Sequence, residues 1–311
     1  MKKDFISAAD YNKEEILSLF GLTKRLKEMT KKGEFPHILK NNVAALVFEK
    51  PSLRTRVTFE TAMYHLGGNA IFLSQQNIGV GKRETIKDIA KNLSRWVNII
   101  IARTYSHSTV TTLADYGTVP VINALSDIEH PCQTYGDFFT IYEMSRLNSN
   151  TILTYIGDGN NVCNSLLLTA SILGINMIVS TPLVHKPDQN IWNKAVEIAK
   201  TSGATIQWIE NPAEAVKNAD FIYTDVWASM GQEDEAEQRK KIFLHYQVNT
   251  ELLSNAKKDY KIMHCLPAHR GEEITDEVID GSHSIVIDEA ENRLHIQKAI
   301  ILNLLKPEVL I

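Results

Sequence analysis

Two arginines and two hydroxyl side chains occur within one short segment, Ser52-Leu53-Arg54-Thr55-Arg56. An unbroken apolar stretch, 43–48, precedes the segment, and a helical pattern, 57–66, follows it. The segment is therefore predicted to join the end of a buried strand to the start of a helix. Backbone N–H groups and the helix dipole favour an anion at such a position, and arginine forks suit a phosphate. The alternative is a capped helix that carries two solvated arginines.

Polar residues that could take part in binding or catalysis also follow other apolar stretches of the chain. They are Arg103, His130, Asn161, Asp225, Cys265 and Arg293. Ligands of open α/β sheets bind at the carboxyl ends of the strands, which is where these residues are expected. The sequence therefore predicts two sheets whose carboxyl ends face a shared cleft.

The segment Gly157-Asp158-Gly159-Asn160-Asn161 begins like a dinucleotide-binding fingerprint, but Val162 stands at the third glycine position. The end of the next apolar stretch, 180–182, also lacks the acidic residue that would bind a ribose. A nicotinamide-binding role is therefore disfavoured. The alternative is a tight turn between a strand and a helix.

Three further side chains each allow a functional and a structural interpretation. Cys265 is either a thiolate stabilised by arginines or a buried thiol. No second pair of metal ligands is near the segment 264–269, so a zinc site is not predicted there. His130 could act as a general acid or hydrogen-bond donor, or could cap a turn. Asp225 could hold an ammonium group, or could cap a helix or turn.

The composition is that of an ordinary globular protein. The chain has 311 residues, 44% of them hydrophobic and 23% charged, which is long for one core and favours two α/β domains. A net charge of −4 gives no support for a nucleic-acid partner or an acidic membrane surface. No apolar run approaches the length of a membrane span, and no apolar segment follows Met1-Lys2-Lys3, so we expect neither a membrane span nor a secretory signal. Three widely spaced cysteines favour reduced thiols and therefore a cytoplasmic location.

Strand and helix patterns alternate along the whole chain, which predicts two doubly wound parallel sheets. The first domain is expected at 1–148 and the second at 149–289, and the helix at about 290–311 is expected to pack back on the first. A capping box at Asn12 and Glu15 predicts an N-terminal helix, and the charged run 232–241 is expected to be a solvated loop. Besides 43–48, the predicted strands are 70–73, 98–102, 119–125, 151–156, 177–179, 205–209, 221–224, 261–263 and 284–287.

Taken together and in order, these motifs resemble the aspartate/ornithine carbamoyltransferase family over nearly the whole chain. The motifs that carry the resemblance are 52–56, His130-Pro131-Cys132-Gln133, 157–161, 225–231, 264–267 and Glu291-Asn292-Arg293. The resemblance implies transfer of a carbamoyl group from carbamoyl phosphate to the δ-amine of L-ornithine, giving L-citrulline and phosphate. It implies no metal and no organic cofactor, and a homotrimer or an assembly of trimers.

The resemblance also implies a role for each matching residue. Those implied to bind carbamoyl phosphate are Ser52, Leu53 through its backbone, Arg54, Thr55, Arg103, His130, Gln133, Cys265, the Leu266 carbonyl and Arg293. Of these, Arg103, His130, Cys265 and Arg293 are implied to be catalytic. Those implied to bind ornithine are Asn161, Asp225, Ser229 and Met230.

Two departures from the family pattern leave details open. Leu53 replaces a commoner threonine, which matters little if that position contributes only a backbone N–H. A glutamine from a neighbouring subunit is often a ligand in the family, and here Gln76, Asn77 or Lys82 could take that part. The alternative functions are a carbamoyltransferase for another amine, such as putrescine or an acylated ornithine, and a nucleotide-binding oxidoreductase or regulatory module.

Overall fold

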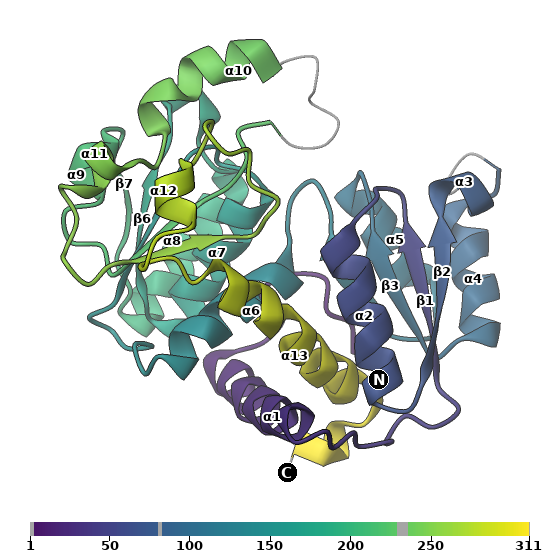
Figure 1. Cartoon of the computed structure of the whole chain (residues 1–311). Coiled ribbons are helices and arrows are strands. Elements are labelled where there is room, and N and C mark those ends of the chain that lie inside the picture. Colours follow the sequence, from purple (N-terminus) through teal and green to yellow (C-terminus); the bar gives the residue numbers. More distant parts are fainter. Residues whose placement is uncertain (1–2, 80–82, 229–235, 311) are drawn as a thin grey trace. The chain divides into compact units, whose positions relative to one another are not determined.

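The computed structural model, shown in Figure 1, describes residues 3–79, 83–228 and 236–310. The chain forms two compact units. Unit 1 comprises Met1–Phe139 and Glu291–Ile311, and unit 2 comprises Thr140–Ala290. The chain therefore passes from one unit to the other twice, each time within a helix.

Unit 1 is built on a parallel sheet of four strands in the order β2-β1-β3-β4. Its strands are β1 (Val43–Phe48), β2 (Asn69–Ser74), β3 (Ile99–Arg103) and β4 (Val121–Leu125). Both ends of each strand lie within two residues of the bounds predicted from the sequence. Phe5 adds a single bridge beside Ile122 of β4, which ties the start of the chain to the edge of this sheet.

Helices cover both faces of this sheet (Figure 1). The helices of unit 1 are α1 (Lys13–Lys31), α2 (Leu53–His65), α3 (Gln75–Ile78), α4 (Ile86–Trp96), α5 (His107–Tyr116), the first part of α6 (Pro131–Glu143), most of α13 (Val286–Leu305) and the short η4 (Pro307–Leu310). Ala45 and Val47 of β1 pack in one apolar cluster with Ile89 of α4 and Val110 of α5. Side chains alternate along a strand, so the intervening residues of β1 face the other side, where α2 contacts the strand.

Unit 2 is built on a parallel sheet of five strands in the order β7-β6-β5-β8-β9. Its strands are β5 (Ile152–Ile156), β6 (Asn176–Ser180), β7 (Ile206–Trp208), β8 (Phe221–Thr224) and β9 (Lys261–His264). Helices connect them: α7 (Asn161–Leu173), α8 (Gln189–Ser202), α9 (Pro212–Ala215), α10 (Ala236–Phe243), α11 (Thr250–Leu253), α12 (Asp276–Ile279) and the short η1 (Leu183–His185) and η3 (Leu244–Tyr246). The prediction of two doubly wound parallel sheets is confirmed.

Two local predictions were wrong. The expected strand at 284–287 is only a single bridge between Ser284 and Ile262, and α13 already begins at Val286. Apolar β-branched residues suggested a strand there, but Asp288 and Glu289 in the first turn favour the helix. The charged run is not wholly a loop, because α10 begins at Ala236; residues 232–235 lie outside the described residues.

In the described residues, no helix combines the length and apolar character that a membrane span requires.

A lysine is buried where α13 packs on α1. Lys298 is 1% exposed, and its Nζ donates to Thr30 Oγ1 at 2.6 Å. Burial disfavours the charged ammonium and lowers the pKa of Lys298 to about 8 from 10.5. Between these two values the unfolded chain binds a proton that the folded chain lacks, so this group makes the protein more stable as pH rises.

We predict that Lys298→Met raises the urea midpoint of unfolding at pH 7, where the wild-type ammonium must be buried charged. The advantage of the variant should shrink at pH 9.5, because the wild-type lysine is then largely neutral in the folded state. Urea titrations followed by circular dichroism at both pH values measure the difference. Lys31→Met, on the exposed end of α1, is the matched control and should show no such change with pH. An advantage of equal size at both pH values would contradict the argument.

Candidate active site

The predicted phosphate segment lies at the N-terminus of α2, directly after β1. Ser52 is the N-cap residue, with an extended backbone, and its Oγ accepts from the backbone N–H of Thr55 at 3.2 Å. Leu53 occupies the first helical position and is 75% exposed. Its side chain therefore contributes nothing to the polar lining of the helix start.

Arg103 ends β3, and His130 lies in the connection that follows the neighbouring strand β4. Arg103 is the last residue of β3 and pairs with Phe48, the last residue of β1. The register between β3 and β4 shifts at Arg103, an irregularity that re-aims side chains at the rim of a sheet. His130 immediately precedes α6, which begins at Pro131, and is 4% exposed.

Arginines from three different elements converge on His130. Burial lowers the pKa of His130 well below its ordinary value of 6.5, and the positive charges of Arg293, Arg103 and Arg54 lower it further. Arg293 also donates from Nη2 to Thr55 Oγ1 at 2.8 Å, which brings α13 to the start of α2. The result is a neutral imidazole in a positively charged site, which is suited to bind a dianion.

The two residues after Pro131 differ in character. Cys132 is buried, its Sγ donates to the Asn123 carbonyl at 3.4 Å, and burial raises its pKa to about 12. This thiol is therefore structural. Gln133 is also fully buried, and its backbone N–H donates to the His130 carbonyl at 3.1 Å, so it belongs to the same turn as the histidine.

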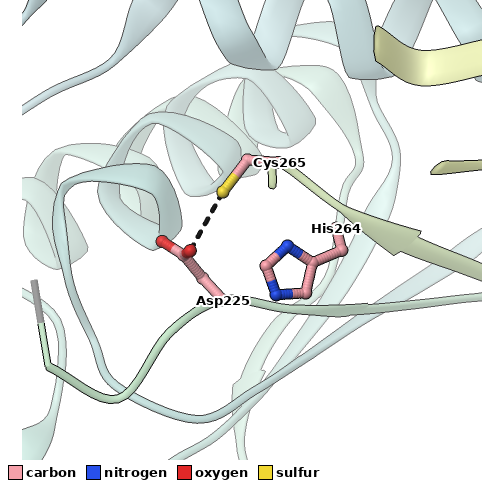
Figure 2. A group of neighbouring side chains, drawn as sticks. All are labelled: Asp225, His264 and Cys265. Atoms are coloured by element: carbon pink, nitrogen blue, oxygen red, sulfur yellow. Dashed lines mark hydrogen bonds between the residues drawn. The ribbon is translucent and has the colours of Figure 1, made fainter. Parts of the chain in front are cut away.

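In unit 2, Asp225 connects the ends of three neighbouring strands. It follows β8, and its Oδ1 accepts from Cys265 Sγ at 2.9 Å (Figure 2) and from the Val226 N–H at 2.8 Å. Its Oδ2 accepts from Asn160 Nδ2 at 2.7 Å. Asn160 is the N-cap residue of α7, and its Oδ1 accepts from the Val162 and Cys163 N–H groups. The carboxylate is thus held in one orientation.

Asn160 is a residue of this network that the sequence interpretation missed. The predicted site residue was its neighbour Asn161, which is the first residue of α7 and is half-buried. The signal was present, because an asparagine before a helix is a common N-cap. Gly159 supports the turn interpretation of this segment, since a Cβ there would lie 2.3 Å from the backbone nitrogen of Pro187.

Two buried glutamates hold the segment that carries Cys265 and Leu266. Glu289 accepts from the His264 backbone N–H at 3.0 Å and from Tyr223 Oη at 3.2 Å. His264 Nδ1 accepts from the Leu266 N–H at 2.8 Å, which leaves the ring proton on Nε2, 3.1 Å from Glu273 Oε1. Leu266 is held at φ 56°, a conformation that is uncommon for a leucine. Neither glutamate was a predicted site residue.

Arg239 of α10 is a further buried group that sequence reasoning missed. It forms an ion pair with Asp158, which follows β5, and its Nε donates to the Trp227 carbonyl at 2.6 Å. His185 Nδ1 lies 3.5 Å from the same aspartate. These contacts hold the start of α10 close to the residues that follow β8. No spacing pattern in the sequence signals them, because the partners are far apart along the chain.

Two groups of side chains in the described part of the chain have the geometry to approach a metal ion: Asp225 with His264 and Cys265 (Figure 2), and His269 with Glu272 and Glu273. In the first group, both ring nitrogens of His264 are already engaged, by Leu266 and Glu273. In the second, Glu272 pairs with Lys240 at 3.0 Å. Both groups are therefore accounted for as hydrogen-bond and ion-pair networks.

Some predicted site residues cannot be placed. Ser229, Met230 and Lys82 lie outside the described residues. Gln76 and Asn77 belong to the short helix α3. The remaining predicted residues fall into two groups, one in each unit: Ser52, Leu53, Arg54, Thr55, Arg103, His130, Gln133 and Arg293 in unit 1, and Asn161, Asp225, Cys265 and Leu266 in unit 2.

Comparison with protein families defines the class to which the chain belongs. Residues 3–143 match the model of the aspartate/ornithine carbamoyltransferase carbamoyl-P binding domain. Residues 149–304 match the model of the aspartate/ornithine carbamoyltransferase Asp/Orn binding domain. The chain therefore belongs to the aspartate/ornithine carbamoyltransferase family, and the predicted resemblance is confirmed.

Individual relatives within the family are similar over almost their full length. A protein of Archaeoglobus fulgidus named ornithine carbamoyltransferase is 52% identical over 306 residues, which are 98% of each chain. A Pyrococcus furiosus protein named ornithine carbamoyltransferase, anabolic, is 49% identical over 96% of this chain and 95% of its own. The solved structure of ornithine carbamoyltransferase from Pyrococcus furiosus matches with a TM-score of 0.94, covering 97% of this chain and 96% of that one.

We predict that His130 is still neutral at pH 6.5, where a free histidine is half protonated, because burial and three arginines disfavour its protonation. In histidine-labelled NMR spectra, the imidazole signal that His130→Gln removes should show no titration midpoint near pH 6.5. Near pH 6.5 the unfolded chain binds a proton at His130, whereas the folded chain does not. The folded protein therefore becomes less stable toward unfolding as pH falls below 6.5. A midpoint near 6.5 for the His130 signal would contradict the electrostatic description of the site.

Proposed function

We propose that the chain is an ornithine carbamoyltransferase, which transfers the carbamoyl group of carbamoyl phosphate to the δ-amine of L-ornithine and releases L-citrulline and phosphate. The observation that carries the proposal is the convergence of Arg54, Arg103 and Arg293 on a neutral His130 at the end of the sheet in unit 1. A phosphorylated acyl donor needs such a site. The names of the relatives that match nearly the whole chain support ornithine as the acceptor.

Unit 1 is proposed to bind carbamoyl phosphate. The first N–H groups of α2, the Ser52 and Thr55 hydroxyls and the Arg54 guanidinium hold the phosphate. Arg103, Thr55 and His130 stabilise the carbonyl oxygen as negative charge develops on it. A neutral His130 serves this purpose as a hydrogen-bond donor. Gln133 fixes the carbamoyl group, and Arg293, together with Cys265 and the Leu266 carbonyl of unit 2, completes the reaction centre.

Unit 2 is proposed to bind ornithine. Asp225 holds the α-ammonium group, and the hydrogen bonds from Asn160 and Cys265 keep its carboxylate correctly oriented. Asn161, Ser229 and Met230 complete the acceptor site in this proposal. An acceptor that lacks the amino acid group leaves the buried carboxylate of Asp225 without an ammonium partner, which costs affinity and rate.

The chemical step needs no covalent enzyme intermediate. The neutral δ-amine attacks the carbonyl carbon, the new N–C bond forms, and the C–O bond to phosphate breaks. The amine loses a proton, and the departing phosphate can take it up. An alkylamine has a pKa of about 10 in water, so a desolvated site beside cations favours the reactive neutral form. Orientation of the two bound substrates supplies much of the remaining acceleration.

Several finer assignments belong to the same proposal. We place the enzyme in biosynthesis, which the anabolic name of one relative supports. We expect a homotrimer or an assembly of trimers in the cytoplasm. The three cysteines form no disulfide with one another, which suits a reducing compartment.

We predict that ornithine is preferred over putrescine, aspartate and N-acetylornithine by at least about a hundredfold in kcat/KM, because only ornithine pairs every polar group of the acceptor site. A colorimetric assay of the ureido product, with carbamoyl phosphate and each amine in turn, measures the preference. Comparable values for putrescine and ornithine would refute ornithine as the physiological acceptor while leaving the carbamoyl transfer intact.

We predict that Cys265→Ala lowers kcat by about tenfold without abolishing turnover, because the hydrogen bond to Asp225 is lost. Since Sγ donates to a carboxylate, the sulfur carries its proton and is a poor nucleophile. Cys265→Ser keeps a donor and should retain more activity than the alanine variant. Detection of a carbamoylated Cys265 by mass spectrometry would contradict this role.

A further inference from the structure

Two buried polar side chains lie one turn apart on α6. Gln133 and Asp137 are both fully buried, and Gln133 Nε2 donates to Asp137 Oδ1 at 2.8 Å. Gln133 shares its turn with His130, whereas Asp137 is one turn farther along the helix. Asp137 was not among the predicted site residues and has no part in the proposed substrate contacts.

The chemistry of this pair determines the orientation of the glutamine amide. A carboxylate oxygen that carries no proton can only accept a hydrogen bond, and the NH₂ group of the amide is the end that faces Asp137 Oδ1. The carbonyl oxygen of Gln133 is on the other branch of the amide and is directed away from the carboxylate. Without such a partner, a glutamine side chain presents either its donor or its acceptor with nearly the same shape.

We infer that Asp137 is a positioning residue that makes Gln133 an obligate hydrogen-bond acceptor toward the carbamoyl NH₂ group of the donor substrate. The inference rests on the proposed function. An acceptor at this position distinguishes a carbamoyl phosphate from an acyl phosphate of the same shape, such as acetyl phosphate, whose methyl group has no N–H to donate. Asp137 thereby contributes to donor specificity without touching the substrate.

The polarity of the pair can be reversed. In Asp137→Asn the new amide can donate to the Gln133 oxygen, which allows the glutamine to rotate and present its NH₂ group to the substrate. The exchange Gln133→Glu with Asp137→Asn restores the original polarity, because the introduced amide then donates to the introduced carboxylate, whose second oxygen remains to accept. The exchange also keeps one buried carboxylate in the pair.

Two matched ligands test the inference by calorimetry, and neither requires turnover. Phosphonoacetamide carries a carboxamide and a phosphonate, and acetonylphosphonate has a methyl group where the first has NH₂. Wild type should bind phosphonoacetamide about tenfold or more tightly than acetonylphosphonate, because the second leaves a buried acceptor unpaired. In Asp137→Asn this ratio should fall by at least about threefold, because only the Leu266 carbonyl then remains as a certain acceptor for the NH₂ group, while the affinity for inorganic phosphate stays within about threefold of wild type.

The double exchange should recover most of the wild-type ratio, which loss of packing alone would not explain. If Asp137→Asn does not fold, the double exchange is compared with wild type directly, and a ratio retained within about threefold supports the inference. A wild-type ratio near one, or an unchanged ratio in Asp137→Asn, overturns it. Failure of the ureido assay with ornithine, by contrast, would refute the proposed reaction and leave the ligand ratio as an independent result.

Discussion

The concentration of positive charge around His130 is the constraint on which the architecture of unit 1 depends. Three arginines lower the pKa of the same buried imidazole: Arg54 from the start of α2, Arg103 from the end of β3 and Arg293 from the middle of α13. Bringing like charges together costs free energy, and a bound dianion offsets that cost. The parallel sheet makes the arrangement possible, because it brings the ends of β1 and β3 together at one edge.

A neutral histidine fits this constraint better than a charged one. Imidazolium beside three guanidinium groups would add to the repulsion, whereas neutral imidazole still offers an N–H donor to a developing oxyanion. Carboxylates then serve a complementary purpose. Asp137 and Asp225 each accept a hydrogen bond from the NH₂ group of a neighbouring amide, Gln133 in unit 1 and Asn160 in unit 2. In unit 1 the carboxylate of Asp137 orients the amide, whereas in unit 2 the Val162 and Cys163 N–H groups orient Asn160, which in turn donates to Asp225.

Local features of the chain could be predicted from the sequence, whereas long-range ones could not. Nine predicted strands were correct, since unbroken apolar runs are typical of buried parallel strands. The capping box at Asn12 and Glu15 was also correct, because its partners are three residues apart. The prediction of a strand at 284–287 was wrong, because short β-branched runs occur in both strands and helices. Its pairing with β9 is limited to one bridge, from Ser284 to Ile262, and the acidic first turn of α13 favours the helix that begins at Val286.

The sequence by itself determined the fold class, the family and the residue types of the candidate site, because these follow from periodicity and from motifs whose members are close together. Only the tertiary structure decided which side chains act on one another. The contact of Arg293 with Thr55, the ion pair of Arg239 with Asp158 and the bond from His264 to Glu273 all depend on chain segments meeting in space. Protonation and amide orientation are set by such neighbours, since the free energy of a buried charge or hydrogen bond depends on its surroundings rather than on residue type.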